Sequence, residues 1–267
     1  GSEMCIRDRT GGDNNVQFVC RSLADAGLGG VQVYIGENLG SPGERVLKGT
    51  ASELAEIPCA DLAVMLVLNP NSVNPFEPVR DEMLTRAKVP MTKEEVRWVS
   101  VARLGVQPGD TVWDVGAGTG AVTFELARKA MDGAVFAVER NTEAIELIMQ
   151  NRQKLGGFNV HIVQGHAPEV LADLPRPNCV FVGGSGGNMR EIIETALVKN
   201  PKARIAVNAI ALETLQETQR LFAEFGLQQV EITQLSAARG KSIGCYTMMT
   251  ANNPVFILSG KGDKYGE

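Results

Sequence analysis

The stretch Val112-Trp113-Asp114-Val115-Gly116-Ala117-Gly118-Thr119-Gly120 decides the fold. An apolar run leads directly into three alternating glycines, and helical spacing begins at Ala121. Glycine is favoured where a turn needs unusual backbone angles or where a ligand approaches the backbone closely. The pattern therefore predicts a strand, a tight turn that holds a ligand, and a helix. A tight strand-to-helix turn without a ligand is the alternative.

Apolar strands and amphipathic helices alternate around this stretch. The expected strands cover residues 111–115, 134–138, 160–163, 179–182, 203–207, 229–234 and 255–258. The expected helices cover residues 93–104, 121–131, 142–155, 169–173, 189–198 and 212–225. This alternation predicts an α/β fold, a Rossmann-like doubly wound sheet covered on both faces. The last two strands lack a helix between them and are expected to pair antiparallel. Thr92 is the expected N-cap of the first helix.

Two classes of cofactor fit the glycine turn. Gly116-x-Gly118-x-x-Ala121 matches the dinucleotide fingerprint, in which a pyrophosphate lies at the helix N-terminus. Asp114 favours S-adenosyl-L-methionine instead, because a carboxylate repels a pyrophosphate but attracts an ammonium and a sulfonium. Glu139 ends the next strand and is expected to accept ribose hydroxyls, which fits either cofactor. We expect a backbone contact from Ala167 to the adenine, with a plain turn as the alternative.

Three further segments are candidates for substrate binding. Four glycines surround Ser185, and the backbone N–H groups of Gly184, Ser185 and Gly186 suit carboxylate oxygens. A flexible linker is the alternative there. Asn208 and Glu213 follow the fifth strand and are expected near the mouth of the site. The segment 236–253 is expected to cover the substrate, with Arg239 and Lys241 meeting carboxylates, or to be a solvated loop.

Composition narrows the class of protein. The chain has 267 residues, 44% hydrophobic and 21% charged, with a formal net charge of -5. Lysine and arginine are scattered, so no nucleic-acid partner is expected. No apolar run is long enough for a membrane span, so no membrane partner is expected. The 5 cysteines show no Cys-x-x-Cys spacing. We therefore expect no zinc site or disulfide framework, and a cytoplasmic protein.

The chain is expected to divide near its prolines and asparagines at 69–75. A linker at 71–78 separates a short α/β fragment, 10–70, from the main domain at 79–260, which a tail at 261–267 follows. The fragment shows helices at 16–26 and 52–56 and strands at 31–35 and 62–68, which is little for an independent core. Residues 1–9 look like a tag or artefact and are left out of the expected fold.

Several motifs in the main domain resemble one family. They are Val89-Pro90-Met91-Thr92-Lys93-Glu94-Glu95-Val96-Arg97, Asp114–Gly120, Gly165-His166-Ala167-Pro168-Glu169, Phe181-Val182-Gly183-Gly184 and Asn208–Glu213. Together they look like the cobalt-precorrin-6B C(15)-methyltransferase (decarboxylating) family of cobalamin biosynthesis, over about residues 76–260. The fragment at 10–70 resembles the end of a tetrapyrrole C(5)-methylase through Gly36-Glu37-Asn38-Leu39-Gly40, Glu44-Arg45 and Gly49-Thr50. Most of that domain is missing, so no C(5) activity is expected.

The resemblance implies a C-methyltransferase that also decarboxylates a small-molecule tetrapyrrole, and a homotetramer. It implies that S-adenosyl-L-methionine contacts Thr92, Asp114, Gly116, Ala117, Gly118, Thr119, Gly120, Glu139 and Ala167. Asn208 and Glu213 are expected to orient the substrate or move a proton. Three alternatives remain: a methyltransferase for protein or RNA, a nicotinamide-dependent oxidoreductase, and a non-catalytic scaffold. An Asp/Asn-Pro-Pro-aromatic motif would favour the first alternative and a Tyr-x-x-x-Lys motif the second. The sequence shows neither motif.

Overall fold

The structure is a computed structural model that describes residues 4–10, 15–69 and 77–263. It divides into two compact units. The first consists of Gly1–Glu77 and Arg152–Phe158, and the second of Pro78–Asn151 and Asn159–Glu267. The division lies at the end of the expected linker, 71–78, most of which falls outside the described residues.

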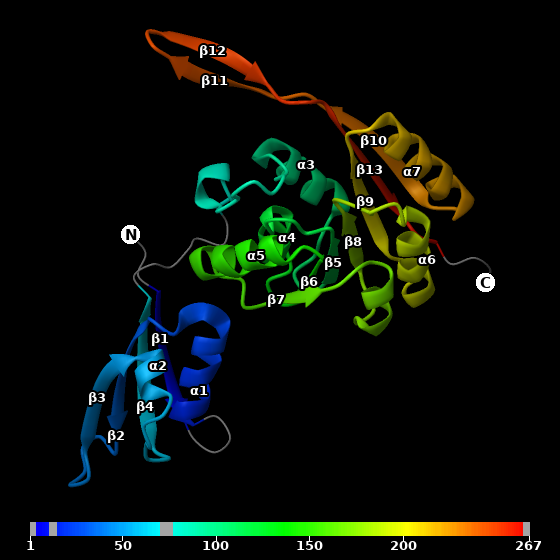
Figure 1. Ribbon diagram of the computed structural model, residues 1–267. Helices are drawn as coiled ribbons and strands as arrows, with labels where there is room; N and C mark the ends of the chain where they lie inside the picture. Colours follow the sequence, from blue (N-terminus) through cyan, green and yellow to red (C-terminus); the bar gives the residue numbers. More distant parts are fainter. Residues whose placement is uncertain (1–3, 11–14, 70–76, 264–267) are drawn as a thin grey trace. The chain divides into compact units, whose positions relative to one another are not determined.

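The first unit is an antiparallel sheet with helices against one face (Figure 1). Its strands β1 (Met4–Thr10), β2 (Gln32–Glu37), β3 (Arg45–Thr50) and β4 (Ala63–Asn69) lie in the order β1-β4-β2-β3. Helix α1 (Val16–Leu23), the π-helical turn η1 (Ala24–Leu28) and helix α2 (Ala51–Leu54) complete it. Every second residue of β2 is buried, and these residues pack with α1 and α2 in a separate apolar core.

Two strands of this unit differ from the expectation. Met4–Thr10, which the sequence analysis set aside, pairs antiparallel with β4. The edge of a sheet offers unpaired N–H and C=O groups to any extended segment, so this pairing needs no side-chain pattern. Strand β3 was not expected, because its sequence, Arg-Val-Leu-Lys-Gly-Thr, shows no regular alternation of apolar and polar residues. The unit has an apolar core, formed mainly by side chains of α1, β2, α2 and β4, which the expected helices and strands made doubtful.

The second unit contains a seven-stranded sheet in the order β10-β13-β9-β8-β5-β6-β7. Its strands are β5 (Thr111–Val115), β6 (Ala134–Glu139), β7 (Val160–Gln164), β8 (Cys179–Val182), β9 (Arg204–Ala209), β10 (Gln228–Leu235) and β13 (Val255–Lys261). Strands β5 to β9 pair parallel, whereas β13 pairs antiparallel with β9 and β10. The expected doubly wound sheet and its antiparallel end are confirmed.

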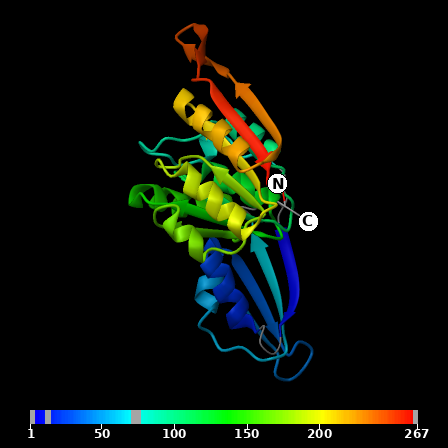
Figure 2. The same cartoon turned by 90° about the vertical axis from the view of Figure 1, so that its right-hand side faces the viewer.

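Helices cover both faces of this sheet. In Figures 1 and 2, α3 (Glu94–Leu104), α4 (Ala121–Lys129) and α5 (Thr142–Leu155) lie on one face, and α6 (Met189–Lys199) and α7 (Leu212–Glu224) on the other. The short 3-10 turn η2 (Asp81–Met83) precedes α3, and η3 (Glu169–Asp173) lies between β7 and β8. The central strands β5 and β8 are buried along almost their whole length, as the two-sided cover requires.

Helix α3 starts one residue later than expected. Its N-cap is Lys93, and the side chain of Lys93 makes no capping hydrogen bond. The expectation that Thr92 caps this helix is therefore wrong. The Thr92 carbonyl instead accepts a hydrogen bond of 2.6 Å from the guanidinium of Arg97. This contact holds Thr92 in an extended segment beside the helix, in place of the cap.

The segment 236–253 forms a two-stranded hairpin, where a cover or a loop was expected. Strand β11 (Ala238–Ile243) pairs antiparallel with β12 (Tyr246–Ala251), and the hairpin extends away from the large sheet in Figure 1. Its apolar side chains, Ile243, Tyr246, Met248 and Met249, are 51–73% exposed. We call Ala238–Ala251 the arm. No helix in the described residues is both long and apolar enough to cross a membrane.

Candidate active site

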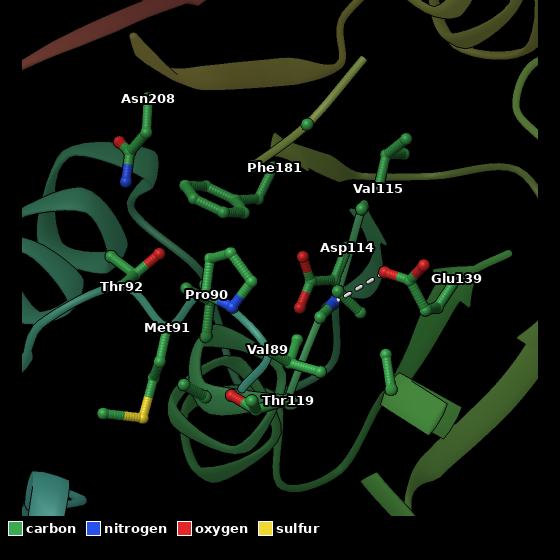
Figure 3. Close-up of a pocket in the computed structure, with 18 of the residues that line it drawn as sticks. Val89, Pro90, Met91, Thr92, Asp114, Val115, Thr119, Glu139, Phe181 and Asn208 are labelled. Atoms are coloured by element: carbon green, nitrogen blue, oxygen red, sulfur yellow. Dashed lines mark hydrogen bonds between the residues drawn. The ribbon is translucent and has the colours of Figure 1, made fainter. Parts of the chain in front are cut away.

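A cavity of about 590 Å³ opens in the second unit where its parallel strands end. Strands β5 and β8 lie side by side there, with crossovers leading to opposite sides of the sheet. Ligands bind at such switch points in open α/β sheets. Three segments supply most of the wall (Figure 3). They are Val89–Lys93, the glycine turn after β5 and residues 183–186 after β8.

The glycine turn is shaped by close contacts. Gly116 has a φ of +75°, and a Cβ placed there would lie 2.6 Å from the carbonyl oxygen of Gly184. Only glycine lets the two loops approach this closely. The backbone N–H groups of Gly116 and Ala117 both donate to the carbonyl of Val138, at 3.0 and 3.1 Å. The turn therefore satisfies these donors internally, and they are not available for a pyrophosphate.

Asp114 is a fully buried carboxyl at the base of the cavity. Its Oδ2 accepts a hydrogen bond of 2.5 Å from the hydroxyl of Thr123, and its Oδ1 has no partner in the described part of the chain. Burial raises the pKa of Asp114 to about 7, and the nearby charge of Glu139 adds to the rise. A buried carboxylate with an orphan oxygen is costly unless a ligand compensates it. An apolar residue at this position of β5 would avoid that cost, so the acid is better explained by a ligand than by the fold.

Glu139 lies across the turn from Asp114 (Figure 3). Its Oε2 accepts a hydrogen bond of 2.8 Å from the N–H of Gly118. Its Oε1 accepts from the N–H groups of Arg140 and Asn141, at 2.8 and 2.9 Å. Three backbone donors thus fix the carboxylate at the rim, where its remaining lone pairs can accept hydroxyl groups of a ligand. This geometry fits the expected contact with a ribose.

The loop after β7 forms the neighbouring wall. Ala167 lines the cavity, and its carbonyl accepts a hydrogen bond of 3.0 Å from the side chain of Asn188. His166 also lines the cavity, and its Nδ1 lies 3.1 Å from the carboxylate of Glu169. That carboxylate orients the imidazole ring, leaving Nε2 facing the glycine loop near Gly186. His166 was not among the predicted site residues, because no metal-ligand partner stands at a useful spacing from it in the sequence.

The expected donors of the second glycine loop are only partly available. Gly184 lines the cavity, and its N–H donates to the Val115 carbonyl at 3.3 Å, a carbonyl that also accepts from the N–H of Gly183 at 2.9 Å. The N–H of Gly184 is thus partly used inside the protein, and its contact with a substrate stays a prediction. Ser185 and Gly186 line the cavity, and their N–H groups have no partner in the part of the chain that the structure describes.

Asn208 ends β9 and lines the cavity opposite Glu139 in Figure 3. Its Oδ1 lies 2.9 Å from the hydroxyl of Ser100 on α3, and its Nδ2 is buried without a partner among the described residues. Glu213, which was expected to work beside it, is exposed on the first turn of α7 and does not line the cavity. The structure thus separates these two candidates.

Arg239 does not line the cavity either. Its guanidinium donates to Glu95 at 2.6 and 2.7 Å and to Asp81 at 3.1 Å, which ties the base of the arm to α3 and η2. These carboxylates hold the pKa of Arg239 above its usual range. The guanidinium is therefore occupied by the protein's own carboxylates. Lys241, two residues further along the arm, has an exposed side chain and is also absent from the cavity wall.

The structure brings most of the other expected residues together. Thr92, Asp114, Gly116, Ala117, Gly118, Thr119, Glu139 and Ala167 all line the cavity. Gly120 starts α4 just behind it, with a φ of +77°. Phe181, Arg140, Asn252 and Asn253 also line the cavity but were not predicted as site residues. Phe181 stands in one of the quoted motifs, and Asn252 and Asn253 belong to the segment that was expected to cover the substrate, but only the pairing of distant strands shows that these side chains reach the cavity.

Comparison with known proteins places this site in a family. Residues 85–261 match the profile of the precorrin methyltransferase domain. A relative from Pyrobaculum calidifontis, named probable cobalt-precorrin-6B C(15)-methyltransferase (decarboxylating), is 42% identical over 68% of this chain and 94% of its own length. A Salmonella typhimurium protein, named cobalt-precorrin-6B C(15)-methyltransferase (decarboxylating), is 33% identical over 68% of this chain and 94% of its own.

Solved structures agree with these relatives. Precorrin-6y C5,15-methyltransferase from Geobacter metallireducens matches with a TM-score of 0.65 and 35% identity, over 70% of this chain and 96% of that chain. Precorrin 8W decarboxylase from Methanobacterium thermoautotrophicum matches with a TM-score of 0.64 and 38% identity, over 68% and 98%. A SAM-dependent O-methyltransferase from Thermotoga maritima, 19% identical, shares the fold. By the domain match and by the identity to these relatives, the chain belongs to the precorrin methyltransferase family.

Proposed function

We propose that this protein transfers a methyl group from S-adenosyl-L-methionine to C(15) of cobalt-precorrin-6B or its metal-free form, with loss of the carboxyl group of the C(12) acetate as carbon dioxide. The reaction is that of the named relatives. The observation that carries the proposal is the chemistry of the glycine turn: the N–H groups of Gly116, Ala117 and Gly118 are used inside the protein, and a buried carboxylate with an orphan oxygen lies below them. This arrangement favours a cationic ligand over a pyrophosphate.

The residues present fit S-adenosyl-L-methionine. Asp114 offers a negative charge to the amino acid part, and Glu139 offers carboxylate oxygens to the ribose. Gly116, Ala117, Gly118 and Thr119 form the floor, Ala167 lies beside the place of the adenine, and Thr92 lies on the opposite wall. When bound, the cofactor supplies an electrophilic methyl group on a sulfonium. The protein's own task is to hold both reactants in a shielded cavity at the right angle, which accelerates reactions strongly.

Charge balance explains why one site can serve both steps. The donor carries a positive charge that is lost on methyl transfer, and the acetate carries a negative charge that is lost as neutral carbon dioxide. The electron pair of the broken bond to the carboxyl group replaces the pair that the ring gives to the methyl group. The CH₂ group left at C(12) must then gain a proton to become a methyl group, and the ring carbon that accepts the new methyl group can supply one, so the reaction takes up no net proton. Asn208 then serves as the residue that orients the substrate, with Glu213 at a distance on α7.

Substrate carboxylates require donors at the outer wall. Ser185 and Gly186 offer backbone N–H groups, and Lys93 and Arg140 offer side-chain charges on the wall itself. Gly184 offers a third N–H group, which is partly used inside the protein. Of the two basic residues on the arm, Lys241 has an exposed side chain that is suited to a carboxylate, whereas Arg239 is occupied by Glu95 and Asp81.

We also propose that the protein works in the cytoplasm, and the exposed arm supports the proposal of a homotetramer. An isolated two-stranded hairpin is at best marginally stable in water. The four large apolar side chains of the arm are exposed by half or more. Packing of arms from several copies would bury them and would account for a hairpin that extends away from its own sheet. We assign no methyl transfer to the first unit, because the cavity is built from the second alone.

Turnover with a labelled cofactor tests this function. The protein is incubated with methyl-labelled S-adenosyl-L-methionine and either precorrin-6B or cobalt-precorrin-6B, with RNA and peptide mixtures as comparison substrates. We expect label in the tetrapyrrole and release of carbon dioxide in equal amount, and none in RNA or peptide. Binding of NAD but not of S-adenosylhomocysteine, measured by calorimetry, would overturn the proposal in favour of a nicotinamide-dependent enzyme.

A further inference from the structure

We infer that the side-chain amide of Asn208 is a hydrogen-bond donor for a carboxylate of the substrate, and that Ser100 positions it. This inference rests on the proposed function and assigns a ligand class to one part of the same cavity. Three observations carry it: the Nδ2 of Asn208 is buried without a partner among the described residues, the residue lines the cavity, and its Oδ1 is held from behind by a hydroxyl.

The side-chain nitrogen of Asn208 lacks a hydrogen-bond acceptor among the described residues. An amide N–H that is removed from water without a partner destabilises the folded protein, because its desolvation is not compensated. Such a group is kept where a ligand completes it. In Figure 3 the nitrogen of Asn208 points toward the space between Phe181 and Thr92, and both of these line the cavity. The missing partner is therefore an acceptor inside the cavity.

The position of Ser100 explains how the amide is oriented. The hydroxyl of Ser100 lies 2.7 Å from the carbonyl of Val96 and 2.9 Å from the Oδ1 of Asn208. A hydroxyl has one proton, so it serves one of these acceptors fully at a time. When an anion binds the Nδ2 of Asn208, the Oδ1 must take that proton. The Val96 carbonyl keeps the helical backbone bond that α3 provides. Ser100 is fully buried and has no route to the ligand itself, so it is a positioning residue.

The chemical class of the acceptor follows from the wall and the reaction. The acids of the cavity, Asp114 and Glu139, lie at its glycine-turn end, away from Asn208 in Figure 3. Apart from these two acids, the polar side chains that line the cavity are neutral or basic, among them Thr92, Lys93, Asn252 and Asn253. A substrate that loses carbon dioxide carries at least one carboxylate into this cavity. A neutral amide donates a directional hydrogen bond to such a carboxylate, and this bond is weaker than an ion pair.

Kinetics of two variants test which group of the Asn208 amide faces the substrate. Asn208→Leu removes the donor and retains the volume, and Asn208→Asp replaces the donor with a second acceptor. We expect kcat/KM for the tetrapyrrole to fall about ten- to one-hundred-fold in Asn208→Leu. It should fall at least as far in Asn208→Asp, because the new charge repels the carboxylate. An aspartate variant that outperforms the leucine variant at saturating cofactor would show that an acceptor faces the substrate, and would overturn the inference.

Ser100 is tested against a matched hydroxyl. Ser100→Ala should raise KM for the tetrapyrrole about ten-fold, while the Kd of S-adenosylhomocysteine stays unchanged. The control is Thr218→Val, which removes a buried hydroxyl that donates to the carbonyl four residues earlier at 2.7 Å, on α7 and off the cavity wall. It should leave KM unchanged. In an Asn208→Leu background, Ser100→Ala should add no further effect. Full additivity would mean that Ser100 has a structural role only.

A binding measurement separates this inference from the proposed function. Side-chain amide protons of asparagine are recorded by NMR with S-adenosylhomocysteine present, and the Asn208 pair is identified by its loss in Asn208→Asp. A porphyrin octacarboxylate is then added, and in a parallel sample the same porphyrin with its carboxylates capped as amides. We expect the Asn208 protons to move downfield with the acid and not with the capped form. Equal or absent shifts overturn the inference, whether or not the protein turns over precorrin-6B.

Discussion

The Oε2 of Glu139 lies 2.8 Å from the backbone nitrogen of Gly118, so the acid that ends β6 is attached directly to the glycine turn that follows β5. One prediction follows for cofactor binding. Glu139→Ala should weaken the affinity for S-adenosyl-L-methionine by about 1–3 kcal/mol, because hydrogen bonds to a charged group are lost. Isothermal titration calorimetry measures the change, and an unaltered Kd would refute the ribose role.

Glu139→Gln is the sharper variant. Its amide oxygen can accept from Gly118 or from Arg140 and Asn141, but its NH₂ group must then face the other donors. The turn should therefore lose order as well as charge. We expect an affinity between those of the native protein and Glu139→Ala. An affinity equal to that of the native protein would mean that the negative charge is not used.

Cofactor binding should depend on pH through Asp114. Burial raises the pKa of Asp114 to about 7, well above the value of an unfolded chain. The folded protein therefore holds a proton that the unfolded chain has lost, and Asp114 disfavours folding increasingly as pH rises from about 4 to 7. A cationic ligand favours the ionised form. The affinity for S-adenosyl-L-methionine should thus rise as pH rises toward 7 and fall about ten-fold per unit below it.

Calorimetry between about pH 5.5 and 7.5 checks this dependence against Asp114→Asn. The variant should bind more weakly at pH 7.5 and should show a nearly flat profile. If the native protein and Asp114→Asn showed the same slope, another group would be responsible. Thr123→Val should shift the native profile to higher pH, because the hydroxyl that now donates to Asp114 favours the ionised carboxylate.

The sequence predicts those parts of the fold and site that depend on local pattern. Strand β5, the glycine turn and helix α4 appear where the spacing placed them, since an apolar run and three glycines determine the backbone there. The residues that were missed, such as Phe181 and Asn252, come to the cavity through pairing of distant strands. Arg239 was expected at the substrate because a basic residue suits a carboxylate. Its actual partner, Glu95, lies 144 positions earlier, and no local pattern could reveal that pairing.

Gly116→Ala should disturb the site and the fold together. The φ of +75° costs an alanine about 1–2 kcal/mol, and its Cβ would collide with the Gly184 carbonyl. We expect a lower Tm and a weaker affinity for S-adenosylhomocysteine. Gly109→Ala is the control, because nothing lies within 4 Å of its Cβ. If the two variants had equal Tm values, the close approach of the two loops would be refuted.

Arg97 should be essential for the wall that carries Thr92. Its guanidinium is fully buried and donates to Asp81, to the Thr92 carbonyl and to the Val79 carbonyl, each at 2.6 Å. Arg97→Met removes one of the two guanidinium partners of Asp81 and leaves the Thr92 and Val79 carbonyls without this donor, so we expect a destabilisation of about 3 kcal/mol. Chemical denaturation measures the loss. Arg103→Met, which removes an exposed ion pair with Glu231, should change stability by less than about 1 kcal/mol.

The arm provides a test of assembly, because its two faces differ in the size of their side chains. Pairing places Gly240 opposite Met249 and Ser242 opposite Thr247 on one face, and Lys241 opposite Met248 on the other. Ile243, Tyr246 and Met248 all lie on this second face and are more than half exposed, so the second face should pack against a second arm.

Met248→Glu should then reduce the molar mass measured by light scattering from that of a tetramer. Met249→Glu places the same charge one residue away on the opposite face and should leave the mass unchanged. Because the cavity is built from one copy, the Kd of S-adenosylhomocysteine should be the same in both variants. If both charges or neither dissociated the protein, the apolar face would not be the contact.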